Sequence, residues 1–264
     1  MSTKRAPCPV CNRGPRDTAL ALTTDEHGTV AYCHRCGYTQ AENFERRPDA
    51  PPPVRADNPV EWSERAESIW RRTVSLRRTV GQTYLEHRGC RLPPAGSDLR
   101  FLEPTDKHPP SLCARITDAV SARPLTLHFT RLAPDGRGKA GTERDKLLLA
   151  GHRKRGGVIR LWPNEAVTLG LAIGEGIETC LAAAHLFSPV WATVDCGNLE
   201  RFPVLGGIDA LTIFADHDQA GTHAATACSN RWREAAREVR VLRARRPGAD
   251  VAELTEAMME DRCD

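Results

Sequence analysis

Two apolar runs in the last third of the sequence each lead into acidic residues. Residues 171–174 are followed by Glu175, and residues 211–215 are followed by Asp216 and Asp218. Strands of a parallel sheet end at a common edge, so acids that follow two such strands are expected to reach one point beyond the sheet. Carboxylates in that position are suited to hold Mg²⁺ or Mn²⁺. The alternative for each cluster alone is that the acid only caps the next helix.

The hydrophobic periodicity from residue 166 onward alternates between strand and helix. Strands are expected over residues 168–173, 190–194, 210–214 and 239–242, and helices over 177–186, 222–237 and 251–259. This order predicts a small, mostly parallel sheet flanked by helices, which is an α/β fold.

Four cysteines near the N-terminus follow the pattern C-x2-C-x21-C-x2-C. They are Cys8, Cys11, Cys33 and Cys36. Two such pairs can offer four thiolates to one tetrahedral, structural Zn²⁺, and the polar–apolar segments at 19–23 and 29–32 fit the hairpin of a zinc ribbon. Two disulfides are the alternative. The other six cysteines have no metal-like spacing and are expected to be reduced thiols.

The middle of the chain has a different composition. Five prolines between residues 48 and 59 predict a semi-rigid spacer. Helices are expected over residues 62–76 and 80–87, and strands over 99–102, 111–116, 125–132, 146–149 and 158–162. The turn Pro134-Asp135-Gly136 predicts a hairpin between two of these strands.

Basic residues are concentrated just before the acidic clusters. The net charge of +3 does not by itself indicate nucleic-acid binding, but residues 137–160 carry eight Lys or Arg against two acids. Such a strip is suited to follow a phosphate backbone. The expected contacts are Arg137, Lys139, Lys146, Arg153, Lys154 and Arg155. A solvated charged face is the alternative.

The sequence gives no sign of export. No apolar stretch follows residues 1–5, so no signal peptide is expected, and no run is long enough to span a membrane. We therefore expect a cytoplasmic protein without a membrane partner.

With these motifs the C-terminal region resembles the Toprim domain, the metal-binding catalytic module of bacterial-type primases, topoisomerases and some nucleases. The matching residues are Glu175-Gly176, Asp216-His217-Asp218, Ala220-Gly221 and, as a third acidic position, Asp250. The resemblance implies that Glu175, Asp216 and Asp218 are catalytic, and that these three and Asp250 bind Mg²⁺ or Mn²⁺. Glu175 would act as a ligand or as a general base.

The residues before the Toprim motifs resemble those of plasmid and phage primases. The matching stretches are Tyr84-Leu85, Arg88-Gly89, Leu99-Arg100-Phe101 and residues 136–140 and 146–149. Together with the ribbon, the similarity covers nearly the whole chain. It implies a zinc ribbon (1–41), a proline-rich linker (42–60), a primase-like α+β region that binds DNA or nucleotides (61–165) and an α/β Toprim catalytic domain (166–264).

The resemblance implies a DNA primase that joins ribonucleoside triphosphates into short RNA primers on single-stranded DNA, with a replicative helicase acting in trans. The chain departs from the primase pattern at His217 and Gln219, where Gly and Arg are usual.

Two alternatives remain open. A Toprim nuclease would use the same acids to activate water, and a non-catalytic zinc-ribbon protein would bind DNA and regulate replication. A topoisomerase is disfavoured because it needs a nucleophilic Tyr. Tyr32 and Tyr38 belong to the expected ribbon, and Tyr84 belongs to an expected helix of the primase-like region.

Overall fold

The computed structural model describes residues 2–42, except 12–13, 16, 26–27, 34 and 37, and residues 62–243. The chain divides into two compact units, Met1–Asn58 and Pro59–Asp264. The spacer expected over 42–60, beyond its first residue, and the helix expected over 251–259 lie outside the described residues.

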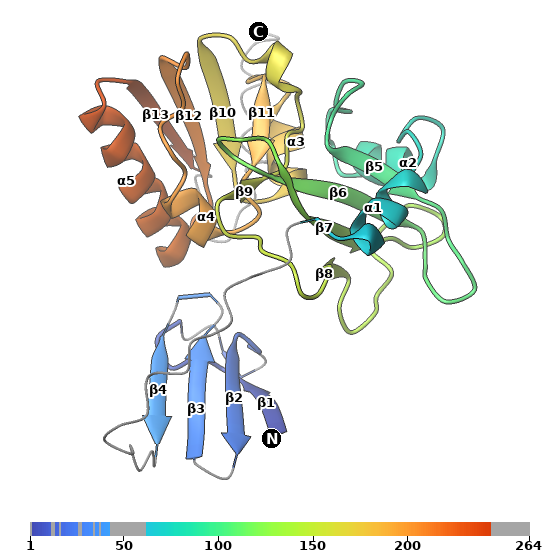
Figure 1. Ribbon diagram of the computed structural model, residues 1–264, viewed down its shortest axis with the longest axis vertical. Helices are drawn as coiled ribbons and strands as arrows, with labels where there is room; N and C mark the ends of the chain where they lie inside the picture. Colours follow the sequence, from blue (N-terminus) through green and yellow to red (C-terminus); the bar gives the residue numbers. More distant parts are fainter. Residues whose placement is uncertain are drawn as a thin grey trace, which may run out of the picture. The chain divides into compact units, whose positions relative to one another are not determined.

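The first unit is a four-stranded antiparallel sheet in which each strand pairs with the next (Figure 1). Its strands are β1 (Ser2–Ala6), β2 (Leu20–Asp25), β3 (Gly28–Cys33) and β4 (Thr39–Glu42). The β2–β3 hairpin confirms the predicted one, whereas β1 and β4 were not expected. The core is small and consists of Cys8, Leu20, Ala31 and Cys33. A core of this size gives little stability, so a metal centre would be needed to hold the sheet together.

The second unit begins with an antiparallel sheet in the order β5-β6-β7-β8, with β9 paired to β6. Its strands are β5 (Leu99–Leu102), β6 (Ser111–Asp118), β7 (Pro124–Arg131), β8 (Lys146–Leu148) and β9 (Gly157–Val158). The predicted turn before Gly136 is present, because the Gly136 amide donates to the Ala133 carbonyl at 2.9 Å and Leu132 bridges to Lys139. The strand expected over 158–162 is shorter, because Ile159 leaves the sheet to bridge Ala192.

Two short helices precede this sheet, α1 (Glu64–Arg71) and α2 (Val80–His87). Ser63 caps α1 by accepting a hydrogen bond from the Ala66 amide. The helix ends five residues earlier than expected. The Thr73 hydroxyl donates to the Trp70 carbonyl at 2.7 Å, and Val74 then pairs with Phe101 as a β-bridge. Bridging to the sheet thus replaces a further helical turn.

The rest of the unit is a four-stranded parallel sheet in the order β11-β10-β12-β13. The strands are β10 (Gly170–Gly174), β11 (Val190–Ala192), β12 (Ala210–Ala215) and β13 (Glu238–Arg243). The helices are η1 (Asn164–Ala166), α3 (Ile177–Ala183), α4 (Cys196–Glu200) and α5 (Gln219–Glu234), of which η1 and α4 were not expected. This arrangement confirms the predicted parallel α/β fold.

Helices cover both faces of the parallel sheet (Figure 1). Residues of α3 pack with Ala172 and Phe214 on one face, whereas α4 and α5 pack with Leu171 and Ile213 on the other. The α3 side also includes Tyr84, Leu85 and Phe101 from the preceding region, so one core runs through both sheets of the second unit. Among the described helices, none combines the length and the apolar character of a membrane span.

Candidate active site and metal centre

The four N-terminal cysteines gather at one end of the first unit. Their Sγ atoms all lie within 4.8 Å of one another, with Cys8 to Cys36 and Cys11 to Cys33 each at 3.7 Å. Four thiolates about 2.3 Å from a tetrahedral Zn²⁺ would be about 3.8 Å apart, so this donor set fits a structural zinc ion. A disulfide needs sulfurs about 2.05 Å apart, and all four cysteines are free thiols. The cluster therefore fits a zinc ribbon.

An ion pair supports the loop that carries the second cysteine pair. The Arg35 guanidinium donates to Asp17 at 3.0 Å, and burial of the Asp17 side chain makes this pair stronger than an exposed one. The hydrogen bond from Arg35 lowers the pKa of the Asp17 carboxyl. His34 lies outside the described residues.

Glu175 occupies the turn between β10 and α3. Gly174 ends the strand, and its carbonyl accepts from the Thr193 amide at 2.7 Å and from the Thr193 hydroxyl at 3.1 Å. A Cβ on Gly174 would lie 3.0 Å from the Cys180 sulfur and 3.2 Å from Phe214 Cβ, so the turn is closely packed from two sides. Gly176 is the N-cap of α3. These contacts fix the backbone on both sides of Glu175.

Asp216 and Asp218 lie in the turn after β12, which ends at Ala215. Both acids therefore lie beyond the end of the strand. Asp218 is the N-cap of α5, and its Oδ1 accepts from the Gly221 amide at 2.7 Å. The capping alternative thus applies to this residue. The packing of the turn requires a residue without a side chain at Gly221, because a Cβ there would lie 2.7 Å from the Asp216 carbonyl oxygen.

The two acidic turns share one edge of the parallel sheet. Gly174 pairs with Phe214, so Glu175 and Asp216 follow neighbouring strands at their carboxyl ends. Ligands of parallel sheets bind beyond this edge. Within the described residues, however, the four cysteines are the one group of three or more metal-type side chains gathered within 4.8 Å. The acids supply the right donors without forming so compact a set, and Asp250 lies outside the described residues.

A further acid follows the third strand of this edge and was missed by the sequence reasoning. Asp195 comes after β11, and the strand order β11-β10-β12 puts it on the far side of Glu175 from Asp216. Its Oδ1 caps α4 by accepting from the Asn198 amide at 2.8 Å. The apolar run before Asp195 is the signal that could have found it.

Three of the six basic residues expected to contact phosphate already have a carboxylate partner within the protein. Lys146 pairs with Glu178 at 3.1 Å, Arg153 pairs with Asp118 at 3.4 Å, and Lys154 pairs with Asp195 at 2.6 Å. Arg137, Lys139 and Arg155 are exposed. Phosphate contacts are therefore easier to make from Arg137, Lys139 and Arg155, which do not have to leave a carboxylate partner among the described residues.

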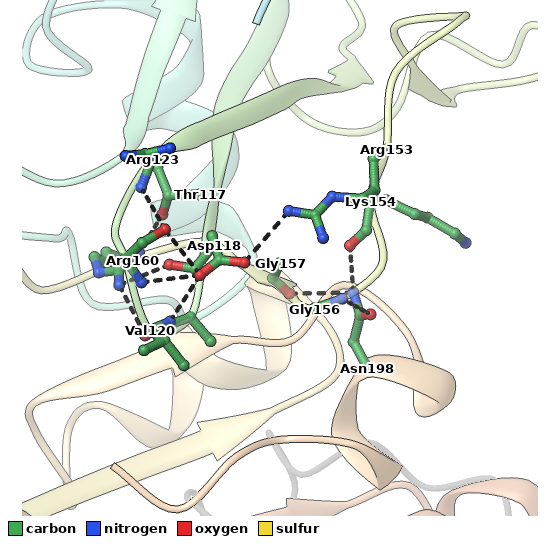
Figure 2. Close-up of polar contacts among 12 residues, drawn as sticks. Thr117, Asp118, Val120, Arg123, Arg153, Lys154, Gly156, Gly157, Arg160 and Asn198 are labelled. Carbon is green, nitrogen blue, oxygen red and sulfur yellow. Dashed lines mark hydrogen bonds and ion pairs between the residues drawn. The ribbon is translucent and has the colours of Figure 1, made fainter. Parts of the chain in front are cut away.

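Arg160, at the end of the basic run, is a structural residue. It is 6% exposed, and its guanidinium donates to the Thr117 hydroxyl, to the Asn164 side chain at 2.7 Å and to the carbonyls of Asp118 and Ala119, each at 3.1 Å (Figure 2). It also lies 4.5 Å from the centre of the Trp191 ring. Its charge is used to join the two sheets of the second unit.

The loop that carries Arg153 to Arg155 is held by one buried amide (Figure 2). The Asn198 side chain in α4 accepts from the Gly156 amide at 3.0 Å and donates to the carbonyls of Lys154 and Gly157 at 3.0 and 3.1 Å. Asn198 is 6% exposed. The short helix α4 therefore sets the path of the basic loop through Asn198.

A buried carboxylate near the acidic turn was also missed. Glu178 lies in the first turn of α3 and accepts from the Tyr84 hydroxyl at 3.0 Å and from the Lys146 ammonium at 3.1 Å. Burial alone would raise the pKa of the Glu178 carboxyl, but the Lys146 charge and its hydrogen bond outweigh it and lower the pKa to about 2. Nothing in the sequence separates this glutamate from a surface residue.

Comparison with known proteins gives two family matches. A family described as a domain of unknown function, DUF7146, matches residues 61–161, and the Toprim domain matches residues 170–259. No curated protein matches the chain.

Three solved structures are similar at low identity. A DNA primase domain from Pseudomonas aeruginosa is 16% identical with a TM-score of 0.40, over 70% of this chain and 58% of that one. The primase fragment of the bacteriophage T7 primase-helicase protein is 14% identical, with a TM-score of 0.43 and coverage of 98% and 96%. The zinc-binding and RNA polymerase domains of the Aquifex aeolicus primase are 13% identical, with a TM-score of 0.45 and coverage of 99% and 77%.

The family match and the fold agree on the C-terminal part. The matched residues contain the whole parallel sheet and both acidic turns, and the cysteine cluster precedes them in a separate unit. The chain carries a Toprim domain over residues 170–259, behind a four-cysteine cluster that fits a zinc ribbon.

Proposed function

We propose that the protein is a primase-like enzyme that joins ribonucleoside triphosphates into short RNA primers on single-stranded DNA in the cytoplasm. The observation that carries this proposal is the Toprim match, with Glu175 and Asp216 at the carboxyl ends of neighbouring parallel strands. The cysteine cluster supports a primase over a nuclease, because a zinc ribbon before Toprim is the arrangement that the primase resemblance implies. A replicative helicase acting in trans is proposed as the partner on the same basis.

The acidic turns are proposed to hold Mg²⁺ or Mn²⁺. Glu175 and Asp216 are the proposed principal ligands, and Asp218 and Asp250 complete the proposed set. Two such ions would supply activation of the primer hydroxyl and stabilisation of the leaving pyrophosphate. The protein's own contribution is to fix the turns, through the Thr193 contacts to Gly174 and the close packing of Gly221 on Asp216.

Template binding is proposed for the ribbon and the exposed basic residues. Arg137, Lys139 and Arg155 are free to approach a phosphate backbone from solvent. Lys146, Arg153 and Lys154 keep a smaller role in the proposal, because each would first have to leave its carboxylate partner.

A non-catalytic DNA-binding regulator is the second candidate. It is favoured by two observations: Glu175, Asp216 and Asp218 do not form a compact set of metal ligands, and Asp218 caps α5. A protein that has lost its catalytic activity would keep the Toprim fold and the N-cap at Asp218 but would no longer bind the metal.

The products of one reaction separate these functions. The protein is incubated with single-stranded DNA, labelled ribonucleotides and Mg²⁺, and the products are sized on a gel before and after alkaline hydrolysis. A primase makes short, labelled, alkali-sensitive chains, a nuclease shortens the DNA without label, and a regulator makes neither product while still binding DNA.

A further inference from the structure

A groove of about 540 Å³ lies on the antiparallel sheet of the second unit, away from the residues assigned above to catalysis. Its lining includes the apolar side chains of Ile69, Leu102 and Phe129, which we call its apolar floor, and three arginines: Arg65 from α1, Arg72 directly after α1 and Arg131 from β7. We call it the arginine groove. Phe129 and Leu102 are only partly buried, although they pack at the edge of the core beneath α1.

The groove exists because α1 is too short to cover the sheet. Its eight residues extend about 12 Å, and Ala66 and Trp70 use that length to cover Cys113, Leu127 and Leu149. The apolar side chains beyond the helix stay half exposed. Exposed apolar surface costs free energy in proportion to its area, so an occupant with an apolar face would be stabilised there.

The arginines of the groove have no carboxylate partner within residues 62–243. Among the described residues, no carboxylate pairs with the guanidinium of Arg65, Arg72 or Arg131, and Glu103 is the one acid among the lining residues. Arg71 gives the contrast, because it lies on the same helix outside the groove and pairs with Glu67 at 2.7 Å. Positions 69 and 72 lie four and seven residues after Arg65, so α1 and its C-cap Arg72 bring both arginines to the same side as Ile69.

We infer that the arginine groove binds single-stranded nucleic acid, with phosphates on the arginines and a base against Phe129. A simple anion would make no use of the apolar floor, and an uncharged apolar peptide would make no use of the arginines. A nucleotide strand has both parts, and grooves for single strands combine cations with an aromatic side chain on which a base stacks. This inference rests on the proposed function, because it assigns a template contact to a protein that acts on DNA.

The groove also connects with the acidic edge along β8. Leu147 lines the groove, and its neighbour Lys146 reaches Glu178 in the first turn of α3, three residues after Glu175. A nucleotide strand lying in the groove would therefore border β8, the β-strand whose Lys146 contacts α3 of the Toprim domain.

The test measures binding of the full-length protein to a labelled oligothymidylate of about twelve nucleotides, by fluorescence anisotropy over a range of salt concentrations. The groove variant is Arg65→Gln with Arg72→Gln. Its matched control is Arg71→Gln with Arg77→Gln, which removes the same charge from the same segment but from residues that do not line the groove. Loss of two phosphate contacts should lower the log–log salt slope by about 1.4 in the groove variant alone.

A second variant tests the apolar floor. Phe129→Leu keeps an apolar side chain but removes the flat ring, so it should weaken binding about tenfold with the salt slope unchanged. Equal slopes for the groove variant and its control, together with full affinity of Phe129→Leu, would overturn the inference. So would an acidic, leucine-containing peptide that binds the parent but not the groove variant while oligothymidylate binds both equally.

Primer synthesis is assayed on the same preparations. A parent that binds DNA through the groove but makes no primers would overturn the proposed function and support the groove. A parent that makes primers while the groove variant binds as tightly as the parent would overturn the groove alone. A parent that binds no oligothymidylate would overturn both.

Discussion

At the scale of single residues, the chain keeps several charges inside the protein by pairing them. Glu178 and Arg160 are both buried, and each has partners for its polar atoms: Tyr84 and Lys146 for the carboxylate, backbone carbonyls and side chains for the guanidinium. An unpaired buried charge would cost several kcal/mol. The basic residues near the Toprim edge therefore serve partly as counter-ions, which their position in the sequence does not reveal.

The cysteine cluster predicts one Zn²⁺ per chain. Elemental analysis of the purified protein should find it, and Cys33→Ser should lose it because one of four thiolates is removed. All five tryptophans lie in the second unit, so tryptophan fluorescence of Cys33→Ser should still report a folded second unit.

Cys228→Ser is the matched control, since Cys228 is a buried thiol of α5 that belongs to no cysteine cluster among the described residues. It should keep the zinc. A parent protein without zinc, or with these four cysteines in disulfides, would contradict the ribbon.

His128 predicts a pH dependence of stability. Burial lowers the pKa of His128 from 6.5 to about 4, and the nearby Lys146 charge adds to this. The unfolded chain therefore binds a proton between pH 6.5 and about 4 that the folded chain does not. The stability that neutral His128 contributes is complete above pH 6.5 and is lost as the pH falls through this window.

Urea unfolding followed by tryptophan fluorescence measures this effect. His128→Leu cannot take up the proton. As the pH is lowered through the same window, its free energy of unfolding should therefore fall less steeply than that of the parent, and the difference in slope should correspond to about one bound proton. Parallel curves for parent and variant would show that His128 titrates alike in the folded and unfolded chain.

At the scale of elements, Gly221 links α5 to the acidic turn. Helix propensity alone predicts that Gly221→Ala stabilises the protein by up to about 1 kcal/mol. The Cβ would lie 2.7 Å from the Asp216 carbonyl oxygen, which is backbone and cannot swing aside. We expect the clash to win and to cost about 1–3 kcal/mol in urea unfolding, as overpacking generally does.

Gly206→Ala is the control for this change, because a Cβ there meets nothing within 4 Å and the backbone is not in the left-handed region. Its stability should stay within about 0.5 kcal/mol of the parent. A Gly221→Ala protein more stable than the parent would mean that the turn can move away from α5.

The strands and longer helices were predictable because their periodicity is strong. The parallel sheet, the β2–β3 hairpin and α2 lie where the pattern of apolar residues put them. Errors came where tertiary contacts override local preference: α1 ends early because Val74 bridges Phe101, and the last strand of the middle region is short because Ile159 bridges Ala192. Such pairings are made with residues far away in the sequence.

The candidate site was predictable to the level of its elements. Glu175 and Asp216 follow neighbouring strands as the motif indicated. What the pattern could not show is which charges are already paired, since Lys146, Arg153 and Lys154 meet carboxylates from distant segments. Asp195, the N-cap of α4, and Asn198 within it escaped notice because a five-residue helix leaves almost no periodic signal.

At the scale of the whole molecule, the chain separates a small cysteine-bearing unit from a larger unit with a continuous core. In the larger unit, Asn198 of α4 holds the basic loop through buried hydrogen bonds, and Arg160 contacts the Toprim sheet at the Trp191 ring. The basic residues of the second unit and the acids Glu175 and Asp216 therefore belong to one compact unit. We expect them to act together on one substrate.

The most direct test of this account is primer synthesis by two variants that remove the same charge from opposite ends of β12. Asp216 follows the carboxyl end of the strand, whereas Asp209 precedes its amino end and pairs with Arg237. Asp216→Asn keeps the side-chain volume but loses the charge that would hold Mg²⁺, so primer synthesis should be abolished with DNA affinity unchanged. Asp209→Asn should remain active. Full activity of Asp216→Asn, or equal loss in both variants, would contradict the assignment of the Toprim edge as the catalytic site.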